Sequence, residues 1–375
     1  MNLFEDFSFE DLMQAYRDCR KNKRNTINAL HFEYELEKNL KELYADLKSG
    51  NYQIGKSICF MVLHPKPREV WAASFRDRVV HHLVYNAIKT RFYNRFIADT
   101  YSCIPARGTM NAAFKLRKYT RNITANYTKD AYFLKADLKN FFVSIDKDIL
   151  MQELEKLVSE KWILDLLHQI VYHDPRTNVQ IRSTKRKFAL LPTYKSLWYT
   201  KASKGLPIGN LTSQFFSNVY LNVLDQYVKH HLKCKYYCRY VDDFVMLSDN
   251  PKQLVEWHRD LTVFLKERLK LDLHQNKKEI NKIKRGIDFV GYVIKPNRTL
   301  PRQRTIKRIF RKINEYKSSP TWFYMEELQA FWASTNSYLG MFQHIQSFRL
   351  RQKICLHCNN LFISADQNFT KLERH

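Results

Sequence analysis

Residues Tyr236 to Leu247, YYCRYVDDFVML, are the stretch that decides the fold of this chain. Two arms rich in aromatic and β-branched residues enclose the acidic pair Asp242-Asp243, which is typical of a β-hairpin with an acidic tip. Two adjacent, partly buried carboxylates repel each other and lose hydration, and a divalent cation between them offsets both costs. The alternative is an ordinary surface turn, where Asp-Asp is common. A third acidic residue is needed to favour the metal site.

Asp137 is that third residue. It ends a predicted strand that begins at Tyr132, and 105 residues (242 − 137) separate it from the hairpin. Neighbouring strands of one sheet can present all three carboxylates to a pair of Mg²⁺ ions, which prefer oxygen ligands and which Mn²⁺ can replace. Two such ions about 4 Å apart activate a primer 3′-hydroxyl and stabilise the departing pyrophosphate. The sequence thus predicts a nucleotidyl transferase with Asp137, Asp242 and Asp243 as catalytic metal ligands.

The charge of the chain indicates a polyanionic partner. Lys and Arg number 63 against 37 Asp and Glu, so the formal net charge is +26. Such a field attracts nucleic acids or anionic membranes, although ribosomal and other basic structural proteins share it. No stretch approaches the roughly 18 consecutive apolar residues of a spanning helix, and Met1–Asp6 lacks the basic start of an export signal. We expect a cytoplasmic nucleic-acid-binding protein with no membrane partner.

The seven cysteines are scattered and suit a reducing compartment. Cys355-Leu356-His357-Cys358 is a single Cys-x-x-Cys, and His344 and His375 are further histidines that could complete a zinc site. A structural zinc site usually has a second ligand pair at a defined spacing, and none is patterned here. Helix packing is therefore the favoured role of Cys355 and Cys358, with metal binding left open.

Hydrophobic periodicity predicts a mixture of helices and strands. Helices are expected over residues 8–48 (two helices beginning at Ser8), 78–96, 148–157, 212–231 and 251–269, and strands over 51–54, 58–63, 132–136, 236–240, 244–247 and 289–294. Residues 173–204 are polar and basic and are expected to form an inserted loop or hairpin. The stretch from Lys295 to Lys317 contains nine Lys or Arg and one acidic residue. It predicts a helix, and binding of nucleic-acid phosphates is favoured over a surface helix that contacts only solvent.

The order of these motifs resembles that of reverse transcriptases over nearly the whole chain. Asp137 to Phe142 (DLKNFF) is similar to the segment with the first catalytic aspartate. Lys204 to Gln214 (KGLPIGNLTSQ) is similar to the template- and nucleotide-positioning segment, and Tyr240 to Asp243 (YVDD) is similar to the catalytic hairpin. Leu273 to Lys277 (LHQNK) resembles the lysine motif and Phe289 to Tyr292 (FVGY) the primer-grip strand. The resemblance implies an RNA-directed DNA polymerase that uses an RNA template, a DNA or RNA primer and dNTPs.

The resemblance also implies roles for single residues. Lys277 matches the lysine that protonates pyrophosphate, with Lys278 as a rival. Phe142 matches the aromatic residue that excludes a ribose 2′-hydroxyl, although it could belong to the core like Phe141. Contacts with the incoming dNTP are implied for Arg68, Lys66, Phe142, Ile208, Gly209 and Gln214. Contacts with nucleic acid are expected for Tyr240 and Gly291 and, from the basic helix, for Arg304, Lys307, Arg308 and Arg311.

The implied fold class is α+β: a right-hand polymerase with fingers, an antiparallel-sheet palm and a helical thumb. We expect fingers over residues 1–97, a palm over 98–294 with a fingers-type insertion at about 173–204, and a basic helical thumb over 295–375. Template and primer would lie in a basic channel, where binding weakens strongly with added salt.

The positioning motif resembles one branch of the family. Ile208-Gly209 and Ser213-Gln214 replace the Gln-Gly and Ser-Pro of retroviral and intron-encoded enzymes and are similar to the reverse transcriptases of bacterial diversity-generating retroelements. That branch implies error-prone cDNA synthesis with a small accessory protein. Two alternatives stay open: an antiphage defence reverse transcriptase that copies a noncoding RNA, and an inactive nucleic-acid-binding polymerase homologue. The sequence does not decide the primer, the template RNA, the fidelity or the oligomeric state.

Overall fold

The computed structural model describes residues 7–21, 26–318, 325–358 and 363–374, so that the N-terminal segment Met1–Asp6 and the zinc candidate His375 lie outside the described residues. The chain forms two compact units, each made from separate stretches of sequence. The first unit comprises Met1–Arg107, Ala136–Cys234 and Glu256–Lys278, and the second comprises Gly108–Lys135, Lys235–Val255 and Glu279–His375. None of the helices in the described ranges has the combined length and apolar character that a bilayer crossing requires.

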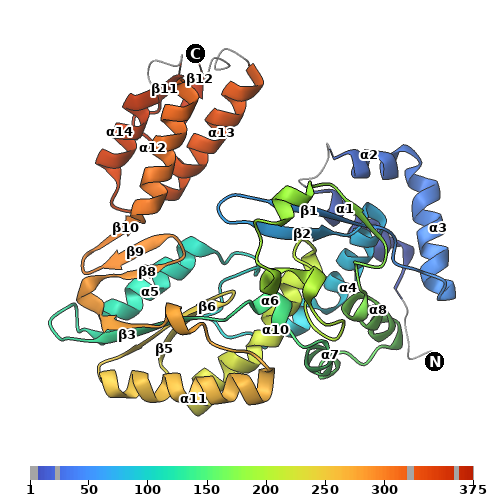
Figure 1. Cartoon of the computed structure of the whole chain (residues 1–375), viewed down its shortest axis with the longest axis horizontal. Coiled ribbons are helices and arrows are strands. Elements are labelled where there is room, and N and C mark those ends of the chain that lie inside the picture. Colours follow the sequence, from blue (N-terminus) through green and yellow to red (C-terminus); the bar gives the residue numbers. More distant parts are fainter. Residues whose placement is uncertain (1–6, 22–25, 319–324, 359–362, 375) are drawn as a thin grey trace. The chain divides into compact units, whose positions relative to one another are not determined.

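Helices make up most of the first unit (Figure 1). Its central helix is α4 (Phe75–Tyr93), which packs against α1 (Phe9–Arg20), α8 (Lys161–Tyr172) and α10 (Leu211–Gln226). α10 continues as a π-helical turn, η3 (Tyr227–His231). The other helices of the unit are α2 (Ile27–Tyr34), α3 (Leu36–Ser49), α6 (Phe141–Ser144), α7 (Lys147–Glu155), α9 (Lys185–Phe188) and most of α11 (Pro251–Leu269).

The N-terminal segment begins as predicted and then departs from the prediction. Ser8 caps α1 in a capping box, since its Oγ accepts from Asp11 N (3.1 Å) while Asp11 Oδ2 accepts from Ser8 N (2.8 Å). Two helices were predicted over residues 8–48, but the described part of this range contains three. The predicted strand at 51–54 is wrong. Residues 51–54 are irregular because the buried Tyr52 side chain sets their conformation: its Oη donates to Asp77 Oδ1 at 2.8 Å.

The sheet of the first unit joins the predicted 58–63 strand to the basic insertion. β1 (Ser57–Val62) pairs antiparallel with β2 (Arg68–Ala72) and parallel with β4 (Val179–Ile181). Residues 173–204 therefore form neither a simple loop nor a hairpin of their own, because they add a strand to an existing sheet. Two short 3-10 turns follow in the same segment, η1 (Thr193–Lys195) and η2 (Leu197–Tyr199).

A buried carboxylate on β2 anchors this insertion. Glu69 is only 4% exposed. Its carboxylate accepts from Ser196 Oγ (2.5 Å), from Leu197 N (3.0 Å) and from the indole Nε1 of Trp71. Three donors satisfy the buried charge, so the carboxylate fixes η2 against the sheet.

Replacing Glu69 by leucine should lower the free energy of unfolding by about 3 kcal/mol, because three buried donors lose their acceptor. Glu69→Gln should cost less, since its amide oxygen still accepts. Urea denaturation measures both, and Glu37→Leu is the control because its side chain is 81% exposed on α3, where a substitution leaves stability nearly unchanged. Equal stability of the two leucine variants would show that Glu69 is not an anchor.

The main sheet of the second unit has the strand order β5-β6-β3-β7. β5 (Tyr236–Tyr240) and β6 (Asp243–Ser248) form the predicted hairpin, and Tyr240 lies opposite Asp243. β3 (Tyr132–Asp137) lies between β6 and β7 (Glu279–Lys282) and is antiparallel to β7; its last two residues belong to the first unit. α5 (Thr109–Ile123) packs against β5 and β6. Phe133, Leu134, Tyr237, Phe244 and Val245 are fully buried and form the core of this sheet.

The C-terminal part of the second unit corrects two predictions. The predicted strand 289–294 is a hairpin of β8 (Ile287–Phe289) and β9 (Tyr292–Lys295), because Val290 (φ 45°) and Gly291 (φ 97°) are both left-handed, as the type I′ hairpin turn requires. β10 (Arg298–Pro301) extends this sheet, so the basic helix begins at Gln303 and not at Lys295.

Three helices follow this sheet. They lie side by side as α12 (Gln303–Lys317), α13 (Met325–Phe342) and α14 (Phe348–Cys358), with a short hairpin of β11 (Ile363–Ala365) and β12 (Leu372–Arg374) (Figure 1). Cys355 and Cys358 are buried in α14, and burial raises the pKa of their thiols to about 11 and about 12. Burial disfavours the thiolate form of both side chains, which belong to the buried core of this unit. The predicted α+β class is confirmed.

Candidate active site

Asp137 and Lys277, 140 residues apart, meet in the first unit. His274 N donates to the carbonyl oxygen of Asp137 at 2.8 Å, which holds the lysine motif beside the end of β3. The turn η4 (Gln275–Lys277) then brings Lys277 Nζ onto Asp137 Oδ2 as an ion pair. Of the two adjacent candidate lysines, Lys277 and not Lys278 makes this contact.

The second oxygen of Asp137 fits a cation ligand. Asp137 Oδ1 is buried and has no hydrogen-bond partner among the described residues. A buried anionic oxygen without a donor is costly, and a bound divalent cation removes that cost. Within the described ranges, no three His, Cys, Asp or Glu side chains are gathered closely enough to hold a metal ion by themselves.

The tip of the acidic hairpin is strained in the second unit. Val241 has φ 55°, a left-handed conformation that β-branched residues avoid at a cost of order 1–3 kcal/mol. Arg239 is fully buried beneath the tip, and its Nη1 donates to the Val241 carbonyl at 3.0 Å. The hairpin is thus held in a shape that its sequence does not favour. Such strain concentrates at functional sites.

Lys135 is a supporting residue that the sequence analysis missed. Its Nζ lies 3.6 Å from Asp243 Oδ2 and donates to the carbonyl oxygen of Asp288 at 2.5 Å. Lys135 thereby connects the acidic hairpin with β8. A signal was available in the sequence: Lys135 precedes Asp137 by two residues in one strand, so that both side chains point to the same face.

The nucleotide-positioning motif lies against β2. Trp71 N donates to the carbonyl oxygen of Ile208 (2.7 Å), and Ala73 N donates to Asn210 Oδ1 (3.0 Å). Gly209 has φ 134°, and a Cβ there would lie 2.8 Å from the Trp71 carbonyl oxygen, so the close approach requires glycine. The structure therefore brings Ile208 and Gly209 beside the strand that begins with Arg68. Arg68 is exposed, as is Lys66 in the connection before it.

Phe141 and Phe142 occupy different environments. Phe141 is 2% exposed and belongs to the core, whereas Phe142 is partly exposed. Leu206 N donates to the Phe142 carbonyl oxygen at 2.9 Å, which places Phe142 beside the positioning motif. Gln214 is exposed on α10, where its Oε1 accepts from Cys103 Sγ at 3.6 Å.

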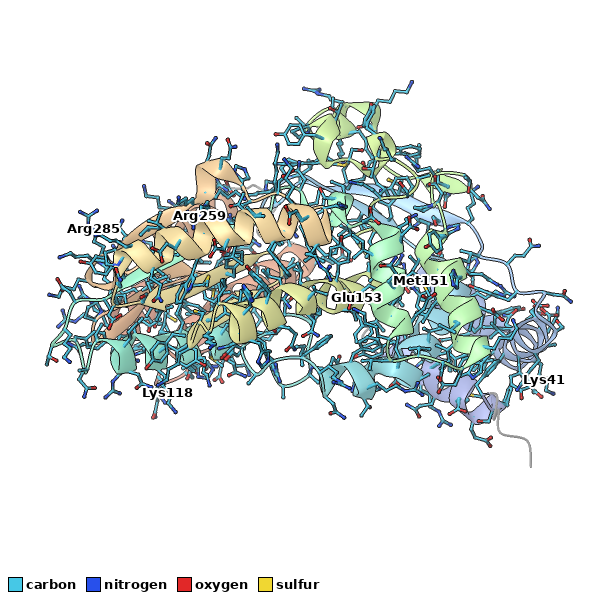
Figure 2. All side chains as sticks on the ribbon, turned by 90° about the horizontal axis from the view of Figure 1, so that it is seen from below. Lys41, Lys118, Met151, Glu153, Arg259 and Arg285 are labelled. Atoms are coloured by element: carbon cyan, nitrogen blue, oxygen red, sulfur yellow. The ribbon has the colours of Figure 1, made fainter. Side chains whose placement is uncertain are left out.

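The predicted nucleic-acid contacts lie on several elements of the second unit. Gly291 forms the turn between β8 and β9, and its carbonyl oxygen accepts from Arg302 N at 3.2 Å. Tyr240 is partly exposed at the end of β5. On α12, Ile309 and Ile313 are fully buried, whereas the basic residues point outward: Arg304, Lys307 and Arg311 are exposed and Arg308 is partly exposed. Lys118 on α5 and Arg285 on the turn η5 (Ile283–Arg285) add exposed positive charge (Figure 2).

A buried histidine lies between α4 and the positioning helix α10. His81 Nδ1 lies 2.8 Å from Thr212 Oγ1, and His81 is 5% exposed. Burial, reinforced by the charges of His82, His173 and Arg78, lowers the pKa of His81 to about 3. The imidazole is therefore neutral in the folded protein at every pH near neutrality.

The low pKa of His81 predicts a loss of stability in acid. Since the unfolded chain has the ordinary histidine pKa near 6.5, between about pH 3 and 6.5 it binds one proton more than the folded protein. His81 makes its full contribution to the free energy of unfolding above about pH 6.5. As the pH falls below about 6.5, the free energy of unfolding should decrease by up to about 1.4 kcal/mol per pH unit. Urea denaturation from about pH 7 to about pH 5 measures this slope. His81→Gln cannot be protonated and should show a shallower slope; identical slopes would contradict the assignment.

The comparisons with known proteins bear on the family of the chain. The family model described as "Reverse transcriptase (RNA-dependent DNA polymerase)" matches residues 64–294, which is more than half of the chain. Protein YkfC of Escherichia coli is 24% identical over 301 residues, covering 71% of this chain and 74% of that protein. The Putative COX1/OXI3 intron 2 protein of Saccharomyces cerevisiae is 21% identical over 281 residues, covering 59% of this chain and 29% of that protein.

Two further matches are a plant protein and a solved structure. Nuclear intron maturase 1, mitochondrial, of Arabidopsis thaliana is 22% identical over 293 residues, covering 59% of this chain and 40% of that protein. The chain thus spans less than half of the yeast and plant proteins. Among solved structures, telomerase from Candida albicans aligns with a TM-score of 0.49 and 12% identity, covering 82% of this chain and 55% of that chain.

Proposed function

Because the chain belongs to the reverse transcriptase (RNA-dependent DNA polymerase) family, we propose that it copies an RNA template into DNA by adding dNTPs to a primer 3′-hydroxyl. Family membership also confirms the predicted right-hand polymerase fold class. The extents of fingers (1–97), palm (98–294 with the insertion at 173–204) and thumb (295–375) are part of the proposal. The observation that best supports the polymerase proposal concerns Asp137, which ends β3, the strand beside β6. Its buried Oδ1 makes no hydrogen bond among the described residues.

Asp137, Asp242 and Asp243 would hold two Mg²⁺ ions, or Mn²⁺ as a substitute. When bound, such ions activate the attacking hydroxyl and balance the charge that develops on the phosphates. The chain's own residues do the positioning. Arg239 fixes the shape of the acidic tip, and Lys277, paired with Asp137, keeps a proton donor beside the site of phosphoryl transfer.

The dNTP would lie between β2, which begins with Arg68, and the positioning motif. Arg68 and Lys66 would bind its triphosphate, and the backbone at Gly209 leaves room for the nascent base pair. Phe142 would lie against the sugar, and Ile208 and Gln214 would contact the base pair. Tyr240 and Gly291 would contact the primer end, and the exposed basic face of α12 would follow the nucleic-acid backbone through Arg304, Lys307, Arg308 and Arg311.

For the biological role we propose mutagenic cDNA synthesis in a bacterial diversity-generating retroelement, in the cytoplasm and with a small accessory protein. The support is the sequence Ile208-Gly209 and Ser213-Gln214, which resembles that branch. Antiphage defence with a noncoding RNA template is the alternative. Sequencing of cDNA from cells that express the protein with its native flanking DNA separates the two, since substitutions at template adenines support diversification and phage-induced products support defence.

Primer extension tests the activity directly. The purified chain, an RNA template, an annealed DNA primer, Mg²⁺ and dNTPs should give products that are longer than the primer. A matched DNA template and a Ca²⁺ reaction serve as controls. Tight binding of template and primer without any extension under Mg²⁺ or Mn²⁺ would instead support the inactive homologue.

A further inference from the structure

The insertion at residues 173–204 is strongly and unevenly charged. Between Pro175 and Lys204 there are eight Lys or Arg and no Asp or Glu. Six of the eight are exposed: Arg182, Lys185, Arg186, Lys187, Lys195 and Lys201. The other two, Arg176 and Lys204, are partly exposed. Arg176 forms an ion pair with Asp174, with 2.6 Å between Nη2 and Oδ2. The rest of this positive charge therefore has no acid within the segment to balance it.

Large aromatic side chains accompany the charge at the surface. Tyr194 is 60% exposed and Tyr199 is 72% exposed. Lys195 Nζ lies 5.5 Å from the centre of the Tyr194 ring, so a cation and a ring are presented together. Exposed rings interleaved with cations are the pattern by which proteins bind single-stranded nucleic acids, in which bases stack on rings and phosphates meet cations.

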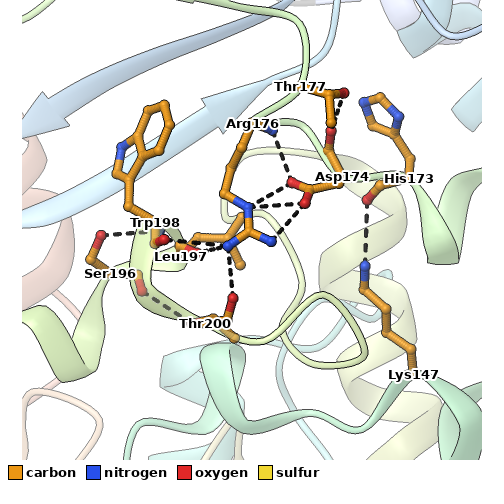
Figure 3. Close-up of polar contacts among 9 residues, drawn as sticks. All are labelled: Lys147, His173, Asp174, Arg176, Thr177, Ser196, Leu197, Trp198 and Thr200. Carbon is orange, nitrogen blue, oxygen red and sulfur yellow. Dashed lines mark hydrogen bonds and ion pairs between the residues drawn. The ribbon is translucent and has the colours of Figure 1, made fainter.

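The backbone around Tyr199, which follows Tyr194 in the same segment, is held by hydrogen bonds from two sides. Arg176 Nη1 donates to the carbonyl oxygens of Leu197 (3.1 Å), Trp198 (3.3 Å) and Thr200 (2.7 Å), as Figure 3 shows. On the sheet side, Glu69 holds Leu197 and its neighbour Ser196. Leu197 is buried, between the exposed Tyr194 and Tyr199. An exposed surface on a fixed scaffold loses little conformational entropy when it binds.

We propose that the insertion is a binding surface for single-stranded RNA, with bases on Tyr194 and Tyr199 and phosphates on the surrounding Lys and Arg. RNA is chosen over DNA because the proposed function has an RNA template, and to that extent the inference rests on it. The bound segment would be template strand that is not paired with primer. This surface adds to the nucleic-acid contacts proposed for Tyr240, Gly291 and α12.

Binding of a labelled, unstructured RNA of about 12 nucleotides, in EDTA and without dNTPs, tests the proposal independently of polymerisation. Tyr194→Ala combined with Tyr199→Ala should weaken binding at least about tenfold, whereas the two tyrosine-to-phenylalanine changes keep the rings and should stay within about twofold. Lys185→Ala, Arg186→Ala and Lys187→Ala together should make the logarithmic salt dependence shallower by about 0.7 for each phosphate that the variant no longer neutralises. Cross-linking of 4-thiouridine RNA should give adducts on peptides that contain Tyr194 or Tyr199.

The outcomes separate this inference from the proposed polymerase activity. Unchanged affinity of the alanine variants, with cross-links only outside residues 173–204, would overturn it. A polyglutamate peptide that competes as well as RNA would assign the surface to an acidic protein and overturn it too. Equal binding of RNA and of DNA with the same sequence would overturn the choice of RNA. If RNA binds as expected but no primer is ever extended, the surface stands and the polymerase proposal fails.

Discussion

Replacing Asp137 by asparagine should slow nucleotide incorporation by at least about a thousandfold, or about 4 kcal/mol of activation free energy, while the protein stays folded. Asparagine keeps the shape of the side chain but loses the negative charge that a hard cation requires. The fold should tolerate the change because Asp137 Oδ1 makes no hydrogen bond within the described residues. Lys277, whose side chain is 47% exposed, remains hydrated when its partner is neutral. Single-turnover primer extension and thermal denaturation measure the two effects.

Asp130 provides a matched control a few residues earlier. It precedes β3 and pairs at the surface with Lys282 (2.8 Å) and Lys284 (2.7 Å). Asp130→Asn removes the same charge from the same part of the chain, and incorporation should stay within about twofold. Were the Asp137 variant to extend primers within about tenfold of the wild type, Asp137 would not hold a catalytic ion and the assignment of nucleotidyl transfer would be wrong.

Elements that depend on local sequence were predicted closely. The hairpin arms 236–240 and 244–247 agree with β5 and β6 to within a residue, because an acidic tip between β-rich arms is a local pattern. The helix predicted over 251–269 has those bounds in α11, which begins at Pro251, a residue suited to the first helical turn.

Elements that depend on distant partners were not predicted. Residues 51–54 have the composition of a strand, but their conformation follows the carboxylate of Asp77, which lies 25 residues from Tyr52. The apolar run from Phe289 to Ile294 hides a turn because Val290 adopts a left-handed conformation that its β-branched side chain disfavours. Periodicity alone cannot indicate a turn of that kind.

The same division holds in the candidate site. The sequence motifs predicted Asp137 and Lys277 as site residues, and in the structure the two form an ion pair. Glu69, Lys135 and Arg239 were missed, because a charged residue within a strand is normally expected at the surface. The burial of Glu69 and Arg239 becomes evident only when their partners are known, which are Ser196 for Glu69 and the Val241 carbonyl for Arg239. Lys135 is only partly buried, and its spacing from Asp137 in the strand was a signal that could have been used.

Replacing Phe142 by alanine should raise the use of ribonucleotides relative to deoxyribonucleotides by at least about a hundredfold, which corresponds to about 2.7 kcal/mol. The partly exposed ring is free to meet a sugar, and alanine removes the atoms that would clash with a 2′-hydroxyl. The local backbone should persist, because its hydrogen bond to Leu206 N uses the main-chain oxygen of residue 142. The measurement is kcat/KM for dGTP and GTP on one RNA template, since their ratio cancels any general loss of activity.

Phe141 supplies the matched control, because it is the same residue type one position earlier but is buried in the core. Phe141→Leu should lower the free energy of unfolding by about 1–2 kcal/mol and leave the dGTP to GTP ratio unchanged. The Phe142 variant should show the reverse, with near-normal stability and altered selectivity. If Phe142→Ala rejected ribonucleotides as strongly as the wild type, the ring would be a packing element like its neighbour, and selection of the sugar would belong to another residue.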